Sequence, residues 1–419
     1  MRFSGFDDEW KKSNLGNISS NEMYGMNSAA KDYDGFNKYI RITDISETSN
    51  KFIPNPLTSP DGDLEDKYKL KKGDIVFART GASTGKTYLY DDNDRNLYFA
   101  GFLIKFHIDN ADPKFIFYNT LKEEYLNWVS VMSVRSGQPG INSNEYKKLP
   151  IILPSLDEQN KISNFLTSID KKIDLLERKH QFYQEFKKFL MQQIFTQKLR
   201  FNFNDAWKTV KIKDIFDERS EKGFLDLELL SVTLNDGVIK RSEIESKDNS
   251  NENKSNYKHV LPGDIVYNSM RMWQGASGVS PYEGIVSPAY TILIPKNVYS
   301  KYFGYYFKTN EMVYQFKKYS QGLTSDTWNL KYPLISEIKI KIPSIEEQKE
   351  ITNVFEIMDE KIKILQNNID ELTTFKKGLL QQMFVVRINW RCNFKLAKSP
   401  SFNKHLLILK NKIIFIIIK

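Results

Sequence analysis

The segment of this chain that comes nearest to a reactive site is a glycine-rich stretch, Thr80-Gly-Ala-Ser-Thr-Gly-Lys-Thr87. A phosphate-binding loop holds a nucleotide with backbone N–H groups and a lysine, and it requires the spacing Gly-x-x-x-x-Gly-Lys. Here Gly81 stands one residue too close to Gly85, and a threonine occupies the position that needs the first glycine. We therefore expect a surface turn that presents Arg79 and Lys86, and not an ATP site.

The rest of the sequence carries none of the common catalytic patterns. Gly-x-Gly-x-x-Gly, Gly-x-Ser-x-Gly and His-Glu-x-x-His are absent, and so is the Asn/Asp-Pro-Pro-Tyr/Phe tetrapeptide of amino-methyltransferases. The four histidines and the single cysteine, Cys392, lack metal-ligand spacing. Carboxylate pairs such as Asp91-Asp92 and Glu346-Glu347 fit a turn and a helix start, where solvation and the helix dipole explain them. The sequence predicts a chain without catalysis of its own.

Two sets of polar and aromatic side chains remain, at corresponding places in the two halves of an internal repeat. Arg, Gln and Asn supply the donors and acceptors that distinguish base edges, whereas Lys, Ser and Thr position phosphates. We interpret both sets as candidate DNA-binding residues, with an ordinary surface loop as the alternative for each residue alone. The first set is Arg79, Lys86, Arg135, Gln138, Asn142 and Lys147, and the second is Arg271, Trp273, Gln274, Thr324, Ser325, Trp328 and Lys331.

The internal repeat spans most of the chain. Residues 149–195 and 338–384 match one another at a constant offset of 189. Upstream of each, Gly73-Asp-Ile-Val-Phe recurs as Gly263-Asp-Ile-Val-Tyr, and the segment that opens with Arg2-Phe recurs from Arg200-Phe. A period of this length is typical of a duplicated domain and is too long for a solenoid. We expect two similar domains, each followed by the same kind of connecting element.

The connecting element has the pattern of a long helix. In both copies a serine with a glutamate three residues on, such as Ser155 and Glu158, matches a capping box, in which the glutamate reaches back to the cap. A helix that runs to Phe195, or to Phe384 in the second copy, would be roughly 60 Å long at 1.5 Å per residue.

Apolar residues in both helices follow a 4-3-4-3 spacing, which is the seam of a coiled coil. We expect the helices to pack on each other in antiparallel orientation. His180 stands where the second copy has Ile369, either as a register device or as a partly exposed histidine. The expected seam residues are Ile162, Leu166, Ile169, Ile173, Leu176, Ile351, Phe355, Met358, Ile362, Leu365 and Ile369.

The other parts of each copy are rich in aromatic residues and alternate short β-type runs with helical stretches. The runs include residues 38–42, 74–78, 289–294 and 338–342, and the helical stretches include 114–134 and 299–319. The sequence predicts an α+β fold of two globular domains separated by two long helices, packed as an antiparallel coiled coil with pseudo-two-fold symmetry. The expected segments are 1–154 and 200–343 for the domains, 155–199 and 344–386 for the helical spacers, and 387–419 for an atypical tail.

The net charge of +9 is concentrated at the end of the chain. Residues 385–419 hold eight Lys or Arg and no Asp or Glu, which leaves +1 for residues 1–384. DNA affinity in the folded part must therefore come from local basic surfaces. The absence of a signal-peptide pattern after Arg2, together with a single cysteine, predicts a cytoplasmic protein.

The tail ends in Ile413-Ile-Phe-Ile-Ile-Ile-Lys, an apolar stretch that Lys410 and Lys412 interrupt. It is too short to span a bilayer. We interpret the tail as a read-through or recombined end that is prone to aggregate, with a membrane-surface anchor as the alternative.

Together these motifs resemble the specificity subunit of type I restriction–modification systems. The resemblance covers about residues 1–386. It rests on the duplicated Gly-Asp-Ile-Val runs, on the Pro-Ser-Leu/Ile-Asp/Glu-Glu-Gln run before each long helix, and on Gln-Gln-Ile/Met-Phe near each helix end. It implies two target-recognition domains held apart by an antiparallel helical spacer. Such a chain selects an asymmetric, interrupted site in double-stranded DNA, with the gap set by the helices. The tail beyond Phe384 departs from the family pattern.

The resemblance also implies partners that supply the chemistry. Two methyltransferase subunits, which bind S-adenosylmethionine, and two ATP-dependent restriction/translocase subunits are expected to join this chain. S-adenosylmethionine, ATP and Mg²⁺ are then expected on the partners, and no cofactor or metal on this chain. The assembled complex would act as an adenine DNA methyltransferase and an ATP-dependent endonuclease. The residues alone leave two alternatives open: a protein-binding scaffold with a coiled-coil spacer, and a self-contained DNA-modifying enzyme.

Overall fold

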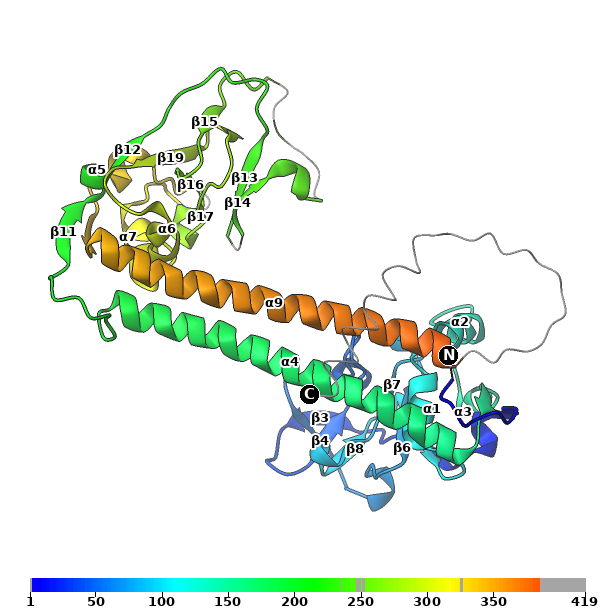
Figure 1. Ribbon diagram of the computed structural model, residues 1–419. Helices are drawn as coiled ribbons and strands as arrows, with labels where there is room; N and C mark the ends of the chain where they lie inside the picture. The colour runs from blue at the N-terminus through cyan, green and yellow to red at the C-terminus, as the bar shows by residue number, and fades with distance from the viewer. Residues whose placement is uncertain (1, 235, 246–249, 251–252, 325–326, 385–419) are drawn as a thin grey trace, which may run out of the picture. The chain divides into compact units, whose positions relative to one another are not determined.

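The computed structural model describes residues 2–384, apart from residues 235, 246–249, 251–252 and 325–326. The chain forms two compact units. The first is Met1–Leu166 with the end of the second long helix from Lys376, and the second is Thr167–Phe375. Each unit therefore holds one globular α+β domain together with parts of both long helices (Figure 1). The atypical tail lies outside the described residues.

The two long helices are α4 (Leu156–Phe195) and α9 (Ile345–Met383). Each begins directly after the expected capping serine, whose hydroxyl accepts a hydrogen bond from the backbone N–H three residues on. The distance is 3.4 Å from Ser155 to Glu158 and 3.3 Å from Ser344 to Glu347. These hydroxyls satisfy one of the N–H groups that every helix start leaves without an intrahelical partner. The structure confirms that a long helix follows each domain, with the expected start and length.

The remaining elements follow a similar order in both domains, with an additional helix, α5, in the second. The first domain contains β1 (Lys11–Asn14), β2 (Ser19–Tyr24), β3 (Ala29–Asp32), β4 (Lys38–Ile40), β5 (Thr58–Asp61), β6 (Asp74–Ala78), β7 (Thr87–Leu89), β8 (Leu97–Phe99), β9 (Leu103–Ile108), α1 (Pro113–Asn119), α2 (Glu123–Met132), α3 (Ser143–Tyr146) and β10 (Pro150–Leu153). The second contains β11 (Lys208–Lys211), α5 (Ile212–Ile215), β12 (Phe216–Glu218), β13 (Leu230–Thr233), β14 (Gly237–Lys240), β15 (Lys258–Val260), β16 (Ile265–Asn268), β17 (Ser277–Val279), β18 (Gly284–Val286), β19 (Tyr290–Pro295), α6 (Ser300–Tyr306), α7 (Asn310–Tyr319), α8 (Tyr332–Ile335) and β20 (Lys339–Ile342).

Each domain is built on a four-stranded antiparallel sheet. The strand order is β2-β9-β6-β7 in the first and β12-β19-β16-β17 in the second. A two-stranded ribbon, β1-β10 or β11-β20, brings the start of each domain beside the strand that leads into the following long helix. Each expected helical stretch is a pair of short helices, α1 with α2 and α6 with α7. The expected α+β class is confirmed.

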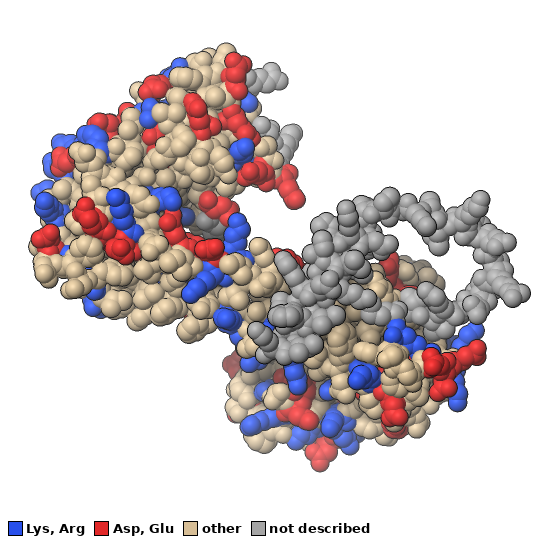
Figure 2. Space-filling view, viewed as in Figure 1, with Lys and Arg blue, Asp and Glu red and all other residues tan. Residues whose placement is uncertain are grey.

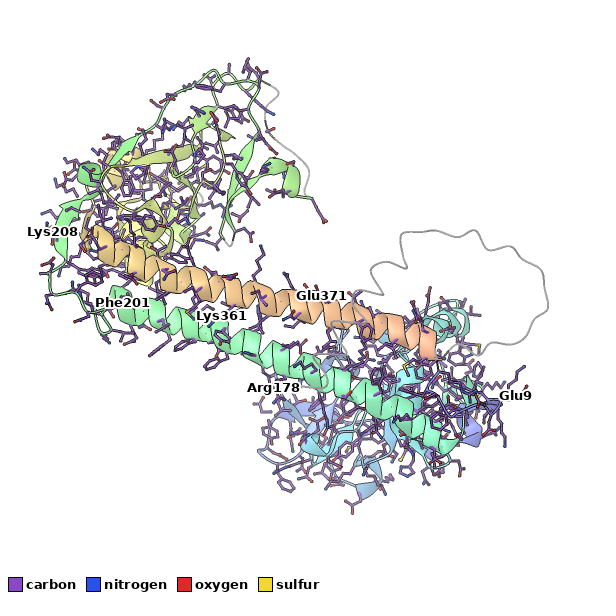
Figure 3. All side chains as sticks on the ribbon, in the orientation of Figure 1. Glu9, Arg178, Phe201, Lys208, Lys361 and Glu371 are labelled. Carbon is purple, nitrogen blue, oxygen red and sulfur yellow. The ribbon has the colours of Figure 1, made fainter. Side chains whose placement is uncertain are left out.

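Within the second unit, α4 and α9 lie side by side and run antiparallel (Figure 1). Lys361 of α9 lies 5.9 Å from the ring centroid of Tyr183 on α4, and Lys361 is labelled in Figure 3. Lys187 donates to Asp359 at 2.5 Å. Further along, the rings of Phe195 and Phe355 stack with centroids 5.9 Å apart. Residues later in α4 therefore contact residues earlier in α9, as expected for antiparallel helices.

Part of the expected seam packs against the globular domain rather than only against the other helix. Ile351, Phe355 and Met358 belong to one core cluster with strands and helices of the second domain and with the end of α4. The reason is that the first turns of α9 lie directly on the domain that precedes them. Of the other seam residues, Ile173, Leu176 and Ile362 are half-buried, whereas Ile162, Leu166, Ile169, Leu365 and Ile369 are buried.

A pair formed by a partly exposed arginine and a buried glutamate joins each domain to its long helix, and we call this pair the junction. In the first unit, Arg2 Nε and Nη2 donate to the two carboxylate oxygens of Glu158 at 2.7 and 2.8 Å. In the second unit, Arg200 binds Glu347 in the same way at 2.9 and 2.8 Å. Both glutamate side chains are almost fully buried, with exposures of 0% and 1%. Bidentate, charge-assisted hydrogen bonds of this kind offset the cost of burying the carboxylates.

The junction corrects two expectations. Glu158 and Glu347 were expected to reach back to the helix cap, and Glu347 was expected to need only solvation or the helix dipole. Instead both carboxylates face an arginine from the start of the domain, and Glu347 also accepts from the Trp207 indole at 3.2 Å. The following glutamine completes the contact, because its side-chain oxygen accepts a backbone N–H of the domain at 2.9 Å in both copies.

No helix in the described part of the chain carries an apolar stretch long enough to cross a membrane.

Candidate nucleic-acid interface

In the first unit, the glycine-rich segment is a closed turn after β6. Gly81 and Gly85 take positive φ values of 73° and 91°, a region that favours glycine. The turn satisfies much of its own backbone, since Thr84 N donates to the Gly81 carbonyl and Gly85 N donates to the Ala78 carbonyl, both at 3.0 Å. Gly81 N donates to Pro139 at 2.9 Å. N–H groups that are used in this way are not available to cradle a phosphate.

Arg79 lies between two aromatic rings at the end of β6. Its guanidinium carbon is 5.0 Å from the ring centroid of Tyr24 and 5.9 Å from that of Phe102, within cation–π range. Its Nε donates to the Gly101 carbonyl at 3.0 Å. The side chain is thus fixed against the domain, although Tyr24 and Phe102 are themselves exposed.

The loop of residues 135–142 lies beside this turn. Ile141 N donates to the Arg79 carbonyl at 2.9 Å, and Gln138 lies against Gly81, where an added Cβ would come within 2.9 Å of the glutamine amide nitrogen. Asn142 caps α3, with its side-chain oxygen accepting from Glu145 N at 3.0 Å. The structure therefore brings Arg79, Gln138 and Asn142 together. We call this set the first loop surface.

Three basic side chains of the predicted site are paired with carboxylates. Arg135 binds both oxygens of Glu145, at 2.7 and 2.6 Å. Lys86 is paired with Glu47, and Lys147 with Glu22. The Lys147 ammonium, as the donor of a hydrogen bond, lowers the pKa of the Glu22 carboxyl. A base or phosphate contact by any of the three requires the carboxylate to be displaced or shared.

In the second unit, the corresponding loops meet through the same backbone bond. Leu330 N donates to the Ser269 carbonyl at 2.9 Å, as Ile141 does to Arg79 in the first unit. Trp273 and Trp328 pack edge to face with centroids 5.3 Å apart. Lys317 lies 5.5 Å from the Trp328 ring. We call these two loops, residues 269–276 and 321–331, the second loop surface.

Several predicted residues of the second loop surface are available for contact. Arg271, Gln274 and Lys331 are exposed, and among the described residues their side chains make no hydrogen bond or ion pair. The backbone of Thr324 is held by the Thr327 hydroxyl at 3.1 Å, and its side chain is exposed. Ser325 lies outside the described residues. Among the described residues, the second surface thus has an exposed, unpaired arginine two positions before Trp273, whereas the arginines of the first are held.

The fold places Lys331 before α8 as it places Asn142 before α3, which agrees with the offset of 189 between the two copies. Sequence reasoning missed Tyr24, Phe102 and Lys317. Tyr24 and Phe102 come from β2 and from the turn between β8 and β9, far in sequence from the polar loops. The only sequence signal that could have indicated Phe102 is that this aromatic residue directly follows a glycine, Gly101.

Both loop surfaces can offer hydrogen-bond donors, acceptors and flat apolar rings, the groups that contact base edges and sugars. On the face drawn in Figure 2, Lys and Arg are interspersed with Asp and Glu in each domain. Within the described residues, no group of three or more His, Cys, Asp or Glu side chains is placed to hold a metal ion. The two loop surfaces therefore carry the kinds of groups that contact DNA bases and sugars.

A duplicated α+β domain, with a different loop surface on each copy and nearly the same long helix after each, defines a class of two-headed recognition proteins. Residues 7–181 and 204–374 each match the family model for the type I restriction modification DNA specificity domain. The chain belongs to this family, and the resemblance noted from the sequence is confirmed.

Named relatives agree with this family. The MjaVIII type I restriction enzyme specificity subunit of Methanocaldococcus jannaschii is 23% identical over 354 residues, which cover 76% of this chain and 80% of the relative. The HindI specificity subunit of Haemophilus influenzae is 26% identical over 193 residues, covering 45% and 41%.

Solved structures share the fold. The S subunit of a type I restriction–modification system from M. genitalium superposes with a TM-score of 0.58 at 15% identity, covering 92% of this chain and 98% of that one. A chain from a study of complex assembly and conformational transition in a type I system gives a TM-score of 0.51 at 16% identity, covering 91% and 99%.

Proposed function

We propose that this chain is the specificity subunit of a type I restriction–modification complex and reads an asymmetric DNA site in two parts. One observation carries the proposal. The two domains share a fold, a junction and a following long helix, yet the residues of their loop surfaces differ. The first surface holds Arg79 against two rings, whereas on the second the exposed Arg271 has no partner among the described residues. Two unlike surfaces on matched supports suit two unlike half-sites, and the long helices would set the gap.

Partner subunits would supply the affinity that the chain lacks alone. The net charge of residues 1–384 is only +1, and neutralising phosphates dominates most protein–DNA affinity. We expect tight, site-specific binding only after assembly with two methyltransferase subunits, and cleavage only after two restriction/translocase subunits join. S-adenosylmethionine, ATP and Mg²⁺ would be bound by those partners, which would carry out adenine methylation and ATP-dependent cleavage.

An exposed aromatic stripe on α4 supports the partner proposal. Phe182, Phe186 and Phe189 are 60%, 39% and 53% exposed, and their rings stack in sequence at 5.8 and 6.4 Å. Monomeric proteins rarely leave such a contiguous apolar surface in water unless something binds it. The spacing of four and three residues suits a helix from a partner.

The decisive experiment is genome-wide adenine methylation in cells that carry this chain with its cognate methyltransferase, compared with cells that lack the chain. We expect a new interrupted motif. Replacing residues 200–343 with the corresponding domain of a relative should change one half of that motif and keep the other. Methylation that does not depend on the chain, although the complex assembles, would contradict the proposal and leave the scaffold interpretation. Methyl transfer by the purified chain alone would favour the self-contained enzyme instead.

A further inference from the structure

An exposed phenylalanine lies beside the first loop surface, on a turn that several backbone hydrogen bonds hold in place. Phe102 stands between β8 and β9 and is 55% exposed. Its backbone carbonyl accepts from Arg79 N at 3.0 Å, which ties it to the residue after β6. Because Arg79 in turn accepts from Ile141 N, the aromatic ring is linked to the loop that carries Gln138 and Asn142.

The turn that carries Phe102 has little freedom to move. The strand end Gly25-Met26 packs directly on it, with Met26 N donating to the Phe99 carbonyl at 2.8 Å and Gly101 N donating to Met26 at 2.7 Å. A Cβ on Gly25 would approach the Ala100 carbonyl oxygen to 2.3 Å, so only glycine fits there. The backbone beneath the exposed ring is therefore held by close main-chain contacts.

Arg79 also braces the side chain itself. Its guanidinium lies over both Phe102 and Tyr24, and Tyr24 is anchored by its hydroxyl, which accepts from Ser143 N at 3.1 Å. With Nε used by the Gly101 carbonyl, much of the arginine is committed to the protein. Arg79 thus acts as a positioning residue for the aromatic ring.

The second domain has nothing comparable at this place. The same backbone bond exists there, from Ser269 N to the Ala289 carbonyl at 3.2 Å, so Ala289 corresponds to Phe102 and Ser269 to Arg79. The braced ring is consequently a property of one half of the molecule. General packing does not explain it, because the second domain forms the same sheet without it.

We propose that Phe102 is a wedge that enters the base stack of the half-site contacted by the first domain and partly unstacks one base step. This inference rests on the proposed function. Apolar side chains that insert between base pairs must overcome the stacking of that base step, and a rigidly held ring does so without first losing its own freedom. Pyrimidine–purine steps unstack most easily, so the half-site should contain one at the point of entry. The wedge would thereby add a sequence preference that does not depend on hydrogen bonds to the bases.

The test uses the assembled complex of this chain with its methyltransferase partner and duplexes that carry 2-aminopurine at each adenine position of the first half-site. Unstacking raises 2-aminopurine fluorescence. We expect one position to brighten severalfold on binding of the wild-type complex, Phe102→Ala to abolish the rise, and Phe102→Leu to keep part of it. Phe36→Ala is the matched control, since Phe36 is 67% exposed in the same domain and should leave the signal unchanged.

A second variant tests the role of Arg79. We expect Arg79→Ala to lower the 2-aminopurine signal as Phe102→Ala does, while the methylated motif keeps its other base preferences. Relaxed preference at a single guanine, with the fluorescence intact, would instead make Arg79 a direct reader. The inference is overturned if Phe102→Ala leaves the fluorescence rise at the wild-type level, or if the variant fails only in binding a partner protein. If the wild-type complex shows no site-specific methylation at all, the proposed function fails first.

Discussion

The individual side chains of the two loop surfaces are held to very different degrees. In the first domain Arg135 is paired with a carboxylate, and Arg79 is fixed by rings and a carbonyl. In the second domain Arg271 is exposed and makes no hydrogen bond or ion pair among the described residues. A free guanidinium can make the bidentate contact that selects guanine, whereas a held one must first give up its partner. Direct arginine reading is therefore expected from the second domain.

We expect Arg271→Ala to relax discrimination in one half-site only. Losing one good bidentate contact should reduce the preference for the correct base by about 1–3 kcal/mol, which corresponds to about five- to 150-fold. Competition binding of the assembled complex to duplexes altered at single positions measures this effect. Lys331→Ala is the comparison, because a phosphate contact carries no base identity. An equal affinity loss for Arg271→Ala on every sequence would place Arg271 on the backbone instead.

Glu337 provides a residue-level test by pH. Hydrogen bonds from Lys211 and Lys213, each at 2.6 Å, lower the pKa of its carboxyl from 4.5 to about 2. The folded state thus favours the charged carboxylate, and this stabilisation is present above about pH 4.5 and is lost as the pH falls toward 2. We expect wild type to resist urea slightly better than Glu337→Gln at pH 7, and this gap to shrink below pH 4.5. A gap that widens on acidification would contradict the assignment.

Among the elements, the long helices are the part of the fold that sequence alone specifies best. The capping serine, the apolar spacing and the end near Phe195 predict α4 to within a residue. The contacts of Ile351 and Phe355 with the globular domain were not predictable, because periodicity shows which face is apolar and not what covers it. The loop surfaces follow the same rule. Polar loops could be selected by residue type, but the Tyr24–Arg79–Phe102 cluster needs three strands to meet, and their pairing is not local in sequence.

The junction should be a major source of stability at the start of each helix. Arg200→Met leaves the buried Glu347 carboxylate without its main partner, which is destabilising. We expect this variant to lower the urea midpoint of unfolding strongly and Arg200→Lys to lower it less, since lysine keeps the charge but loses the paired geometry. Adding Glu347→Leu to Arg200→Met should recover much of the loss. No recovery would mean that the arginine acts mainly through its contact with the Asp205 carbonyl.

The aromatic stripe on α4 should matter for assembly rather than for folding. Because Phe182, Phe186 and Phe189 are exposed, replacing all three with Ser should change the urea midpoint little while weakening association with the methyltransferase at least tenfold. Analytical ultracentrifugation of mixed subunits reports the association. Lys188→Ala, an exposed change on the same helix, is the control. Unchanged assembly in the triple variant would exclude this face as the partner site.

At the scale of the whole molecule, the duplicated body and the tail make separate contributions. Both family matches end before residue 375, and every junction and loop surface lies before residue 385. Deleting residues 387–419 is therefore expected to leave both complex assembly and the methylated motif intact, and to increase the yield of soluble protein. Gel filtration and methylation sequencing of the truncated chain check this. Loss of assembly would show that the tail is a working part and not a read-through product.

The junction also has a consequence for how such a chain changes over evolutionary time. Besides an apolar surface that covers the first turns of the helix, the helix start requires little of the preceding domain: one arginine near its first residue, and one main-chain N–H for Gln159 or Gln348 to accept. A main-chain N–H is offered by nearly any sequence. A foreign domain that begins with Arg-Phe and is brought in by recombination would therefore form the junction directly, whatever residues its loops contain. Selection could then act on the new DNA preference without first repairing the fold.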